Sequence, residues 1–405
     1  MRSRGLEALA FTLAALVGCG GGGSGDDASA PSGGEPAPFG PAASGNTGAK
    51  PPTAAASASL DCSGHGCGVT QIALGTIAAC ALLEDATVAC YGGGIVGTLG
   101  RGAERPAIDP IPRRVPGLNG VAKIFGGGYT MCAVLLNGTV SCWGADQSAN
   151  PYGARPGDLF AVEGLSRVKD LAVSTSHTCA LVDTGDLYCF GSNYFGELGD
   201  GTLDNSKRAL KVAGISGARH VATGAEVSCA VVADGGVSCW GMNDHGQLGQ
   251  GDEDKLVHTA PLTVAGLGGP AKSVAASSES GAVCALLESG ESKCWGEKLV
   301  VATGAAAGSA LAVGWNHACA LDGAGAVSCW GANTKGQLGG GSNGPATALV
   351  SVTGLSGAQH LTTGGNSSCV ILGEGGFACW GDDSRGQLGS GQIGPIEPLP
   401  QRRHF

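Results

Sequence analysis

Fourteen cysteines of this chain form seven pairs whose members lie ten positions apart. Two thiols at such a fixed spacing are either oxidised to a disulfide or kept as free, buried thiols. An aromatic residue and then a glycine follow the second cysteine of every pair. The pairs are Cys80 with Cys90, Cys132 with Cys142, Cys179 with Cys189, Cys229 with Cys239, Cys284 with Cys294, Cys319 with Cys329, and Cys369 with Cys379. This repetition indicates one structural unit that occurs seven times along the chain.

The spacing within a pair is that of a β-hairpin. In six copies a glycine lies six positions after the first cysteine, and the first copy has Ala86 there. A three-residue hairpin loop needs a left-handed residue in its third position, which glycine supplies without steric cost. In the second copy, a loop at residues 136–138 places Cys132 opposite Cys142 with Cα atoms about 4.5 Å apart, within the range of a disulfide. We therefore predict seven cross-strand disulfides.

The other three cysteines lie near the N-terminus. Cys62 and Cys67 flank Ser-Gly-His65-Gly, and three ligands on so short a loop are too few for a closed zinc site. The prediction is a small disulfide loop over residues 61–68. Pairing Cys62 with Cys67 then leaves Cys19 unpaired among seventeen cysteines.

Cys19 ends a segment that is typical of an export signal. Residues 1–19 combine two early arginines with an apolar run too short to span a membrane. The end of this segment, Leu16 to Cys19, resembles the lipobox of bacterial lipoproteins, which implies acylation of Cys19. An ordinary secretory signal cleaved near Gly18 is the alternative. Export to an oxidising compartment favours disulfides over free thiols.

Acyl chains on Cys19 predict a protein that is lipid-anchored at the cell envelope. Gly20 would place it in the outer membrane if the cell is Gram-negative. Residues 20–60 are rich in Gly, Ala, Ser and Pro, with few large apolar residues. This composition predicts a flexible, disordered tether.

Few other residues have a type and spacing suited to chemistry. His177 and His317 occupy equivalent positions of two repeats, and a hydrogen bond to a neighbouring turn is favoured over a metal-binding ring. The acidic run Asp252–Asp254 is predicted to be a solvated loop, with calcium binding as the alternative. The sequence contains no catalytic motif and no phosphate-binding loop. We predict no catalytic residue, no cofactor and no metal site, and hence no enzyme activity.

Short strands are the elements that must position these residues. Glycine accounts for 75 of 405 residues, which suits tight turns better than helices. The first cysteines follow one another at 52, 47, 50, 55, 35 and 50 residues, the size of propeller blades of about four strands. An apolar strand candidate precedes most hairpins: Val121–Phe125, Val168–Val173, His220–Thr223, Lys272–Ala276, Ala310–Val313 and His360–Thr363. We predict an all-β protein, a seven-bladed β-propeller with one disulfide inside each blade.

The charge of the chain excludes one class of partner. The formal net charge is −10, and adjacent basic residues occur only as the pairs Arg113–Arg114, Lys207–Arg208 and Arg402–Arg403. A nucleic-acid surface needs a clustered basic face. We therefore expect no nucleic-acid binding, and we expect a monomer.

A second repeated motif follows the aromatic residue and glycine. It reads Gly-Glu-Leu-Gly at residues 196–199 and Gly-Gln-Leu-Gly at 246–249, 336–339 and 386–389, with a weaker copy at 97–100. Together with Gly-x-x-His-x-Cys-Ala-Leu and Trp-Gly-x-Asn, it resembles the regulator-of-chromosome-condensation repeat. The resemblance covers residues 69–405 and implies a seven-bladed β-propeller. The second repeat departs from the pattern at residues 146–160 and the fifth at 297–309, so the fifth blade is expected to lack a strand or a loop.

These observations predict a non-enzymatic binding or scaffold protein that presents loops to a protein or cell-surface partner. Tyr152, Tyr194 and Phe195 are the loop aromatics that could anchor the partner, whereas Phe160 is as well suited to the core. The resemblance implies one alternative, guanine-nucleotide exchange on a small GTPase, which requires a cytosolic partner. Inhibition of an extracellular enzyme is another alternative. A propeller lyase or hydrolase has no supporting residues.

Overall fold

The computed structural model describes residues 60, 67–102, 104, 106–144, 157–251, 254–296, 308–344 and 348–405. The predictions for Cys19, Cys62 and Tyr152, for the segments 1–19 and 20–60, and for most of the loop 61–68 lie outside these residues. Cys67 is described and is disulfide-bonded. No helix in the described part of the chain is long and apolar enough to cross a membrane.

The described strands form seven antiparallel sheets, each made of strands that are consecutive in the sequence. Blade 1 consists of β1 (Val69–Leu74), β2 (Ala78–Leu83), β3 (Val88–Gly93) and β4 (Ile108–Arg114). Blade 2 consists of β5 (Val121–Gly127), β6 (Thr130–Leu135), β7 (Val140–Gly144) and β8 (Phe160–Ala161). Blade 3 consists of β9 (Val168–Val173), β10 (His177–Val182), β11 (Leu187–Gly191) and β12 (Ser206–Lys211). Blades 4 and 5 are β13 (His220–Thr223), β14 (Val227–Val231), β15 (Val237–Met242), β16 (Val257–Thr263); β17 (Ala271–Ala276), β18 (Val283–Leu287), β19 (Ser292–Trp295). Blades 6 and 7 are β20 (Ala310–Val313), β21 (His317–Leu321), β22 (Val327–Gly331), β23 (Val350–Ser351); β24 (His360–Gly364), β25 (Ser367–Ile371), β26 (Phe377–Asp382), β27 (Ile396–Arg403).

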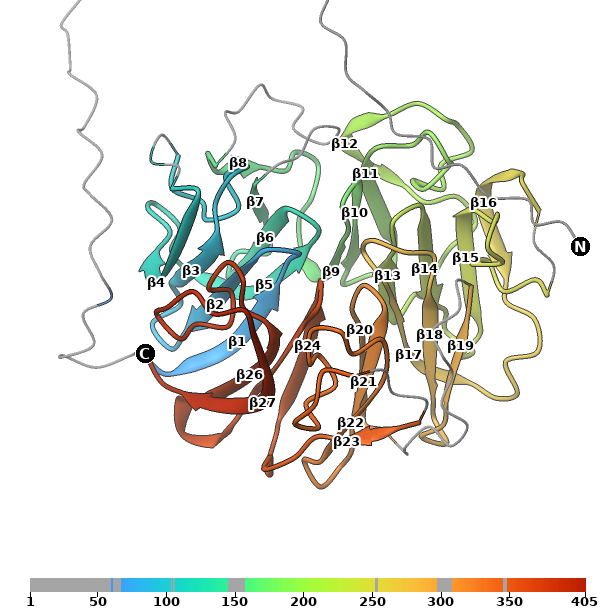
Figure 1. The fold of residues 1–405 in the computed structure, drawn as a ribbon. Coiled ribbons are helices and arrows are strands. Elements are labelled where there is room, and N and C mark those ends of the chain that lie inside the picture. The colour runs from blue at the N-terminus through green and yellow to red at the C-terminus, as the bar shows by residue number, and fades with distance from the viewer. Residues whose placement is uncertain are drawn as a thin grey trace, which may run out of the picture. The chain divides into compact units, whose positions relative to one another are not determined.

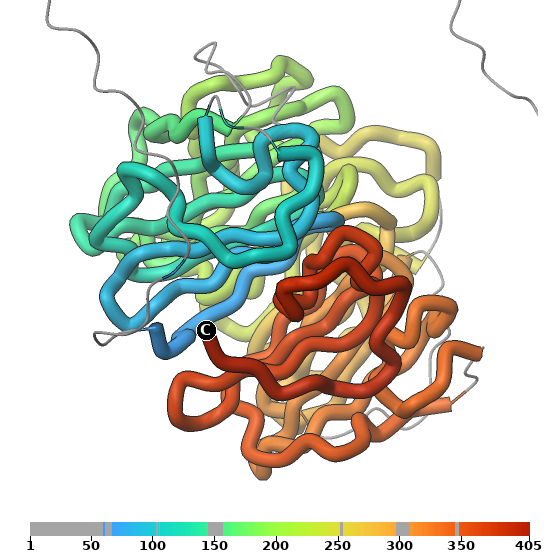
Figure 2. The backbone as a smooth tube through the Cα atoms, turned by 60° about the vertical axis from the view of Figure 1, so that its left-hand side comes forward, coloured from blue at the N-terminus to red at the C-terminus, as the bar shows by residue number. Residues whose placement is uncertain are grey.

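The seven sheets surround a common axis in chain order, with the first strand of each blade nearest the centre (Figure 1). The predicted all-β, seven-bladed propeller is confirmed. Blade 5 has three strands in the described part of the chain, as its short junction predicted, and residues 297–307 are not described. Blade 7 lies beside blade 1 (Figure 2), yet neither blade takes a strand from the other. The ring is therefore closed by side-chain packing.

All seven cysteine pairs inside the repeats form disulfides, as predicted, so these residues are not free thiols. Each disulfide joins the two middle strands of its own blade, one cysteine on the second strand and one on the third. The bonds of blades 1 to 4 are Cys80 to Cys90, Cys132 to Cys142, Cys179 to Cys189, and Cys229 to Cys239. The bonds of blades 5 to 7 are Cys284 to Cys294, Cys319 to Cys329, and Cys369 to Cys379.

The geometry of these disulfides follows the expected hairpin register, with one numerical difference. In blade 2, Cys132 lies opposite Cys142 in the pairing of β6 with β7, and their Cα atoms are 4.0 Å apart. This separation is shorter than the value of about 4.5 Å expected for a non-hydrogen-bonded pair, because the disulfide draws the strands together. The loop closes as expected, because the N–H of Leu135 donates to the carbonyl of Thr139 at 2.8 Å.

Burial of the cysteines differs in one blade. Cys294 of blade 5 is partly buried. The other thirteen cysteines of the seven pairs, among them Cys90, Cys189, Cys239, Cys329 and Cys379, have no exposed surface. Among the described residues, the sheet of blade 5 has three strands and its third strand β19 is the outermost.

The core is divided among the junctions between blades. The described residues contain seven clusters of buried side chains, and each cluster joins one pair of neighbouring blades. The cluster between blades 7 and 1, for example, packs Leu388 and Phe377 against Tyr91 and Leu74. A blade thus buries both faces of its sheet only when two neighbours are present, as in other repeat proteins.

We predict that Ala86→Gly stabilises the protein. Ala86 has φ 60° at the hairpin position that is glycine in the other blades, and an alanine pays about 1–2 kcal/mol for the left-handed conformation. The greater freedom of glycine in the unfolded chain offsets about 0.5–1 kcal/mol of this gain. The expected net gain is about 0.5–1 kcal/mol in the free energy of unfolding, measured by denaturant titration.

The matched control is Gly138→Ala, at φ 78° in the equivalent loop of blade 2. Its added Cβ would lie 2.9 Å from the backbone of Arg167, so this variant should be destabilised. Equal effects of the two substitutions would contradict the assignment of strain to Ala86.

Candidate functional site

One face of the propeller carries the long loops. In each blade the first strand ends at this face, and the third strand also ends there because the strands are antiparallel. The connections to the fourth strands therefore leave from it: residues 94–107, 192–205, 243–256, 332–349 and 383–395. The turns between first and second strands lie at the same face and surround the axis. We call this surface the long-loop face.

The large exposed apolar side chains of the described residues are concentrated on the long-loop face. Seven of the eleven lie in its loops or turns: Ile95, Tyr129, Tyr194, Leu203, Leu256, Trp315 and Ile393. Three others, Ile111, Val257 and Leu399, lie on outermost strands, and Leu136 lies in a hairpin at the opposite face. This asymmetry is typical of a surface that contacts another macromolecule.

A hydrogen bond from an indole to a main-chain carbonyl attaches each of four long loops to the next blade. In blade 3, the carbonyl of Glu197 accepts a hydrogen bond of 2.8 Å from Nε1–H of Trp240 in blade 4. The same contact joins Thr98 to Trp143, Gln247 to Trp295 and Gln337 to Trp380, at 2.9 to 3.0 Å. We refer to this contact as the interblade latch. It explains the tryptophan that follows the second cysteine in blades 2, 4, 5 and 7.

The leucine and the polar residues of the second motif shape the loop that carries the latch. Leu198 is fully buried, and its N–H donates to Oδ1 of Asn193 at 2.9 Å. The Glu197 carboxylate accepts a hydrogen bond of 2.9 Å from the N–H of Phe195. Gln247, Gln337 and Gln387 each accept the equivalent main-chain bond. Burial raises the pKa of Glu197, and its main role is local positioning of the loop.

His177 extends the latch between blades 3 and 4. The hydroxyl of Ser228 donates to the carbonyl of Glu197 at 2.9 Å, so its oxygen accepts the hydrogen bond of 2.7 Å from Nε2–H of His177. Burial lowers the pKa of His177 to about 3, which keeps the ring neutral. The predicted structural role of this histidine is confirmed.

His317 repeats this arrangement with Ser368 of blade 7, at 2.9 Å. The serine partners were missed in the sequence. A serine directly before the first cysteine occurs only at Ser228 and Ser368, in the blades that follow the two histidine-containing repeats. The occurrence of a serine in the repeat that follows each histidine was the signal in the sequence that could have predicted this hydrogen bond.

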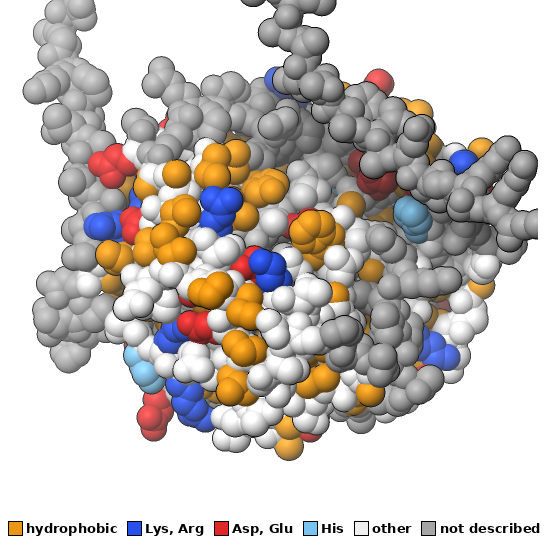
Figure 3. Space-filling model, viewed as in Figure 1, with side chains coloured by type: hydrophobic (Ala, Val, Ile, Leu, Met, Phe, Trp, Pro, Cys, Tyr) orange, Lys and Arg blue, Asp and Glu red, His pale blue; other side chains and the backbone are white. Residues whose placement is uncertain are grey.

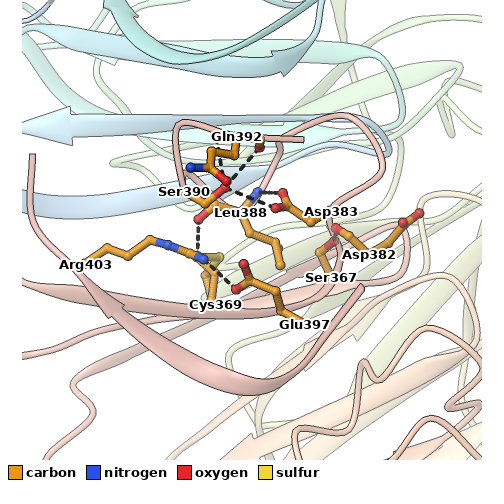
Figure 4. A network of polar contacts seen from close by, with 10 residues as sticks. Ser367, Cys369, Asp382, Asp383, Leu388, Ser390, Gln392, Glu397 and Arg403 are labelled. Carbon is orange, nitrogen blue, oxygen red and sulfur yellow. Dashed lines mark hydrogen bonds and ion pairs between the residues drawn. A yellow bond between two sulfur atoms is a disulfide. The ribbon is translucent and has the colours of Figure 1, made fainter. Parts of the chain in front are cut away.

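The closing junction between blades 7 and 1 lacks the latch, because Tyr91 stands in the place of tryptophan. The Tyr91 hydroxyl is buried and has no hydrogen-bond partner among the described residues, and burial raises its pKa. The ring of Tyr91 instead packs edge-on against Phe405, with the ring centroids 5.7 Å apart. Arg403 of blade 7 donates to the carbonyl of Leu388 at 2.6 Å and forms an ion pair with Glu397 (Figure 4). The long loop of blade 7 is therefore held by a residue of the same blade.

A central channel of about 580 Å³ runs between the first strands of all seven blades. Its walls are mostly apolar, and many of these residues are alanine or valine. Lys123, Asp170, His220 and His360 also line it, near the starts of their strands and away from the long-loop face. The described residues contain no group of three or more His, Cys, Asp or Glu side chains placed to hold a metal ion. Lys and Arg side chains lie among Asp and Glu on the face in view (Figure 3), with no continuous patch of one sign.

The aromatic residues that the sequence suggested as partner contacts differ in how far they are buried. Tyr194 lies on the long-loop face with 67 % of its surface exposed. Phe195 is half-buried beside it, and Phe160 is buried in the cluster between blades 2 and 3, so the core role holds for Phe160. Asp254 accepts a hydrogen bond of 3.0 Å from the N–H of Leu256 and contacts His258 at 3.2 Å; Asp252 lies outside the described residues.

Comparison with known proteins identifies the repeat. A model of the regulator of chromosome condensation (RCC1) repeat matches residues 168–197, 218–247 and 309–337, and a second RCC1-repeat model matches residues 234–284. The chain is a seven-bladed β-propeller, and the segments of it that match RCC1 repeats lie in blades 3 to 6.

Similar proteins of known function share only part of their length with this chain. The human E3 ubiquitin-protein ligase HERC2 is 29 % identical over 140 residues, which is 33 % of this chain and 3 % of HERC2. The ultraviolet-B receptor UVR8 of Arabidopsis thaliana is 33 % identical over 119 residues, 27 % of this chain and 26 % of UVR8. The chain thus spans a small part of both relatives.

Among solved structures, yeast RCC1 (Prp20), crystallised with Kap60, superimposes with a TM-score of 0.51 at 18 % identity, over 82 % of this chain and 74 % of RCC1. Human WBSCR16 gives a TM-score of 0.51 at 19 % identity, over 82 % of each chain. At these identities the likeness concerns the fold.

We predict that Trp143→Phe destabilises the protein more than Trp330→Phe. Both indoles are buried, so both variants lose similar packing. Trp143 also donates to the carbonyl of Thr98 at 3.0 Å, whereas Trp330 has no such bond among the described residues. An unpaired buried carbonyl costs about 1–3 kcal/mol, so the free energies of unfolding should differ by about 1–2 kcal/mol. Equal losses would show that the latch contributes nothing beyond packing.

Proposed function

We propose that this protein is a non-enzymatic scaffold that binds a protein partner through the long-loop face. The observation that supports this most is the placement of seven of the eleven exposed large apolar side chains on that face. Disulfides inside the blades and latches between them hold the loops in place, which lowers the entropy cost of binding. Tyr194 and Trp315 are the aromatic anchors we expect to contribute most, since aromatic side chains dominate binding energies at interfaces.

Guanine-nucleotide exchange is not favoured. The likeness to yeast RCC1 is one of fold, at 18 % identity, and a shared fold does not carry a function with it. Inhibition of an extracellular enzyme would be one form of the proposed binding role.

The binding role is tested by photo-crosslinking in the native cell. A photo-reactive residue at Tyr194 or at Trp315 should give the same covalent adduct with a single partner, because both positions lie on the long-loop face. The control is the same residue at Leu136, which is 72 % exposed at the opposite face. Adducts from Leu136 alone, or equal adducts from all three positions, would contradict the assignment of the face.

We also propose that residues 1–19 direct export and that Cys19 carries the lipid, with residues 20–60 as the tether, residues 61–68 as the small cysteine loop, and residues 69–405 as the propeller. The lipobox-like sequence at Leu16 to Cys19 supports this proposal. Cys19→Ser should move the protein from the membrane fraction to the soluble fraction of the cell envelope, measured by fractionation and immunoblotting. Recovery of the native protein in the cytosol would refute it.

A further inference from the structure

One turn at the long-loop face differs from its six equivalents. The connection between β17 and β18 in blade 5 has six residues, 277–282, whereas the equivalent turns have two or three. Ser278 within it also lines the central channel. We call residues 277–282 the stopper.

The stopper reaches across the axis of the propeller. The hydroxyl of Thr76, in blade 1, donates to Oε1 of Glu279. The hydroxyl of Thr175, in blade 3, donates to the carbonyl of Ser278 at 2.9 Å. Blades 1 and 5 are separated by two blades along the shorter way around the ring, so a turn of blade 5 contacts Thr76 only by crossing the channel. The stopper therefore covers the channel at the long-loop face.

The stopper also holds an exposed aromatic residue. The hydroxyls of Ser277 and Ser280 both donate to the carbonyl of Trp315 in blade 6, at 3.2 and 3.0 Å. The N–H of Trp315 donates to the carbonyl of Gly365 in blade 7 at 2.9 Å. Trp315 is thus positioned on the long-loop face partly by the stopper.

Glu279 has no cation to balance its charge among the described residues. Its second carboxyl oxygen, Oε2, is buried and lacks a hydrogen-bond partner in the same part of the chain. The turns of blades 1, 2, 3, 6 and 7 around it contain no Asp, Glu, Lys, Arg or His, and Tyr129 is their single titratable side chain. Burial alone raises the pKa of Glu279 to about 7.

The remaining titratable groups lie in blade 4 or farther along the channel. Glu226 occupies the turn of blade 4, where burial and Asp244 raise its pKa while His245 lowers it. The side chain of His245 also packs near Gly281 of the stopper and pairs with Asp244 at 3.8 Å. Lys123, Asp170, His220 and His360 lie toward the other end of the channel.

We propose that the stopper is a pH-dependent gate: it closes the channel and seats Trp315 while Glu279 is protonated, and it leaves the channel when Glu279 ionises. The charged carboxylate must bring Oε2 to water, because an uncompensated buried charge is costly. The part of this inference that concerns partner binding rests on the proposed function of the long-loop face.

The sign of the pH dependence follows from the raised pKa. The closed state binds the proton more tightly than the open state, so closure is fully favoured below the ordinary pKa of a glutamate. It weakens as the pH rises from there through about 7. Between the ordinary pKa of a glutamate and about 7, the ratio of closed to open protein should fall by up to about tenfold per pH unit, and above pH 7, where Glu279 is ionised in both states, it should level off.

Hydrogen exchange of the full-length protein tests the gate without any partner. The amides of Glu279 and Ser280 donate to Oγ of Ser277 at 3.3 and 3.1 Å. In the closed state the carbonyl of Trp315 fixes this hydroxyl, so we expect closure to protect both amides. After correction for the intrinsic exchange rate, their protection should fall by more than about tenfold between pH 5 and pH 7 and change little above pH 7. Glu279→Gln, which stays neutral, should keep the protection at both pH values, and Glu226→Gln should behave like the native protein.

A native protein without the pH-dependent loss, or a Glu279→Gln variant that still shows it, would overturn the gate. Loss of protection in Glu226→Gln but not in the native protein would do the same. Photo-crosslinking from Tyr194 at pH 6 and pH 8 then tests the link to binding separately. If hydrogen exchange shows the gate but the yield of adducts does not change with pH, the gate acts on the channel and not on partner binding. If no adduct forms at either pH, the proposal that the long-loop face binds a partner is contradicted.

Discussion

The packing of each blade against both of its neighbours is the constraint on which the ring depends, and at four junctions a hydrogen bond from a tryptophan to a loop carbonyl of the preceding blade adds to it. A single blade leaves both faces of its sheet open, and the seven buried clusters all lie between blades. The latch fixes where neighbouring blades meet, since the indole must reach one particular carbonyl and the adjacent leucine must enter the same cluster. Blades 2 and 5, which lack the motif, precede Phe190 and Trp330, for which the described residues show no latch.

Two kinds of restraint thus act at different scales. Each disulfide closes a loop of about eleven residues inside one blade, and the chain-entropy model assigns it roughly 2.5–3 kcal/mol. Such a short cross-link does nothing to hold one blade against the next. The ring closes at Tyr91 by packing against Leu388 and Phe405, without a shared sheet. This junction therefore depends on apolar contact, as do the two other junctions for which the described residues show no latch.

A ring built in this way holds its loops at fixed positions while their sequences vary. The long-loop face uses that property, because Tyr194 and Leu203 project from a loop whose base is held by Asn193 and Leu198. The stopper shows that the axis is also part of this face, where a turn of blade 5 meets Thr76 of blade 1. The proposed binding on the loops and the proposed closure of the channel therefore concern neighbouring parts of one surface.

The sequence alone determined the blade number, the seven disulfides and six of the first strands, and it indicated the short junction of the fifth blade, in which the described residues form three strands. These features depend on residues close together in the chain, where spacing and the left-handed preference of glycine decide the geometry. Only the tertiary structure decided that Phe160 is buried, that Ser228 accepts a hydrogen bond from His177, and that Glu279 accepts one from Thr76 across the channel. The last two contacts join residues of different blades, 51 and 203 positions apart, and their partners are set by the closure of the ring rather than by any local pattern.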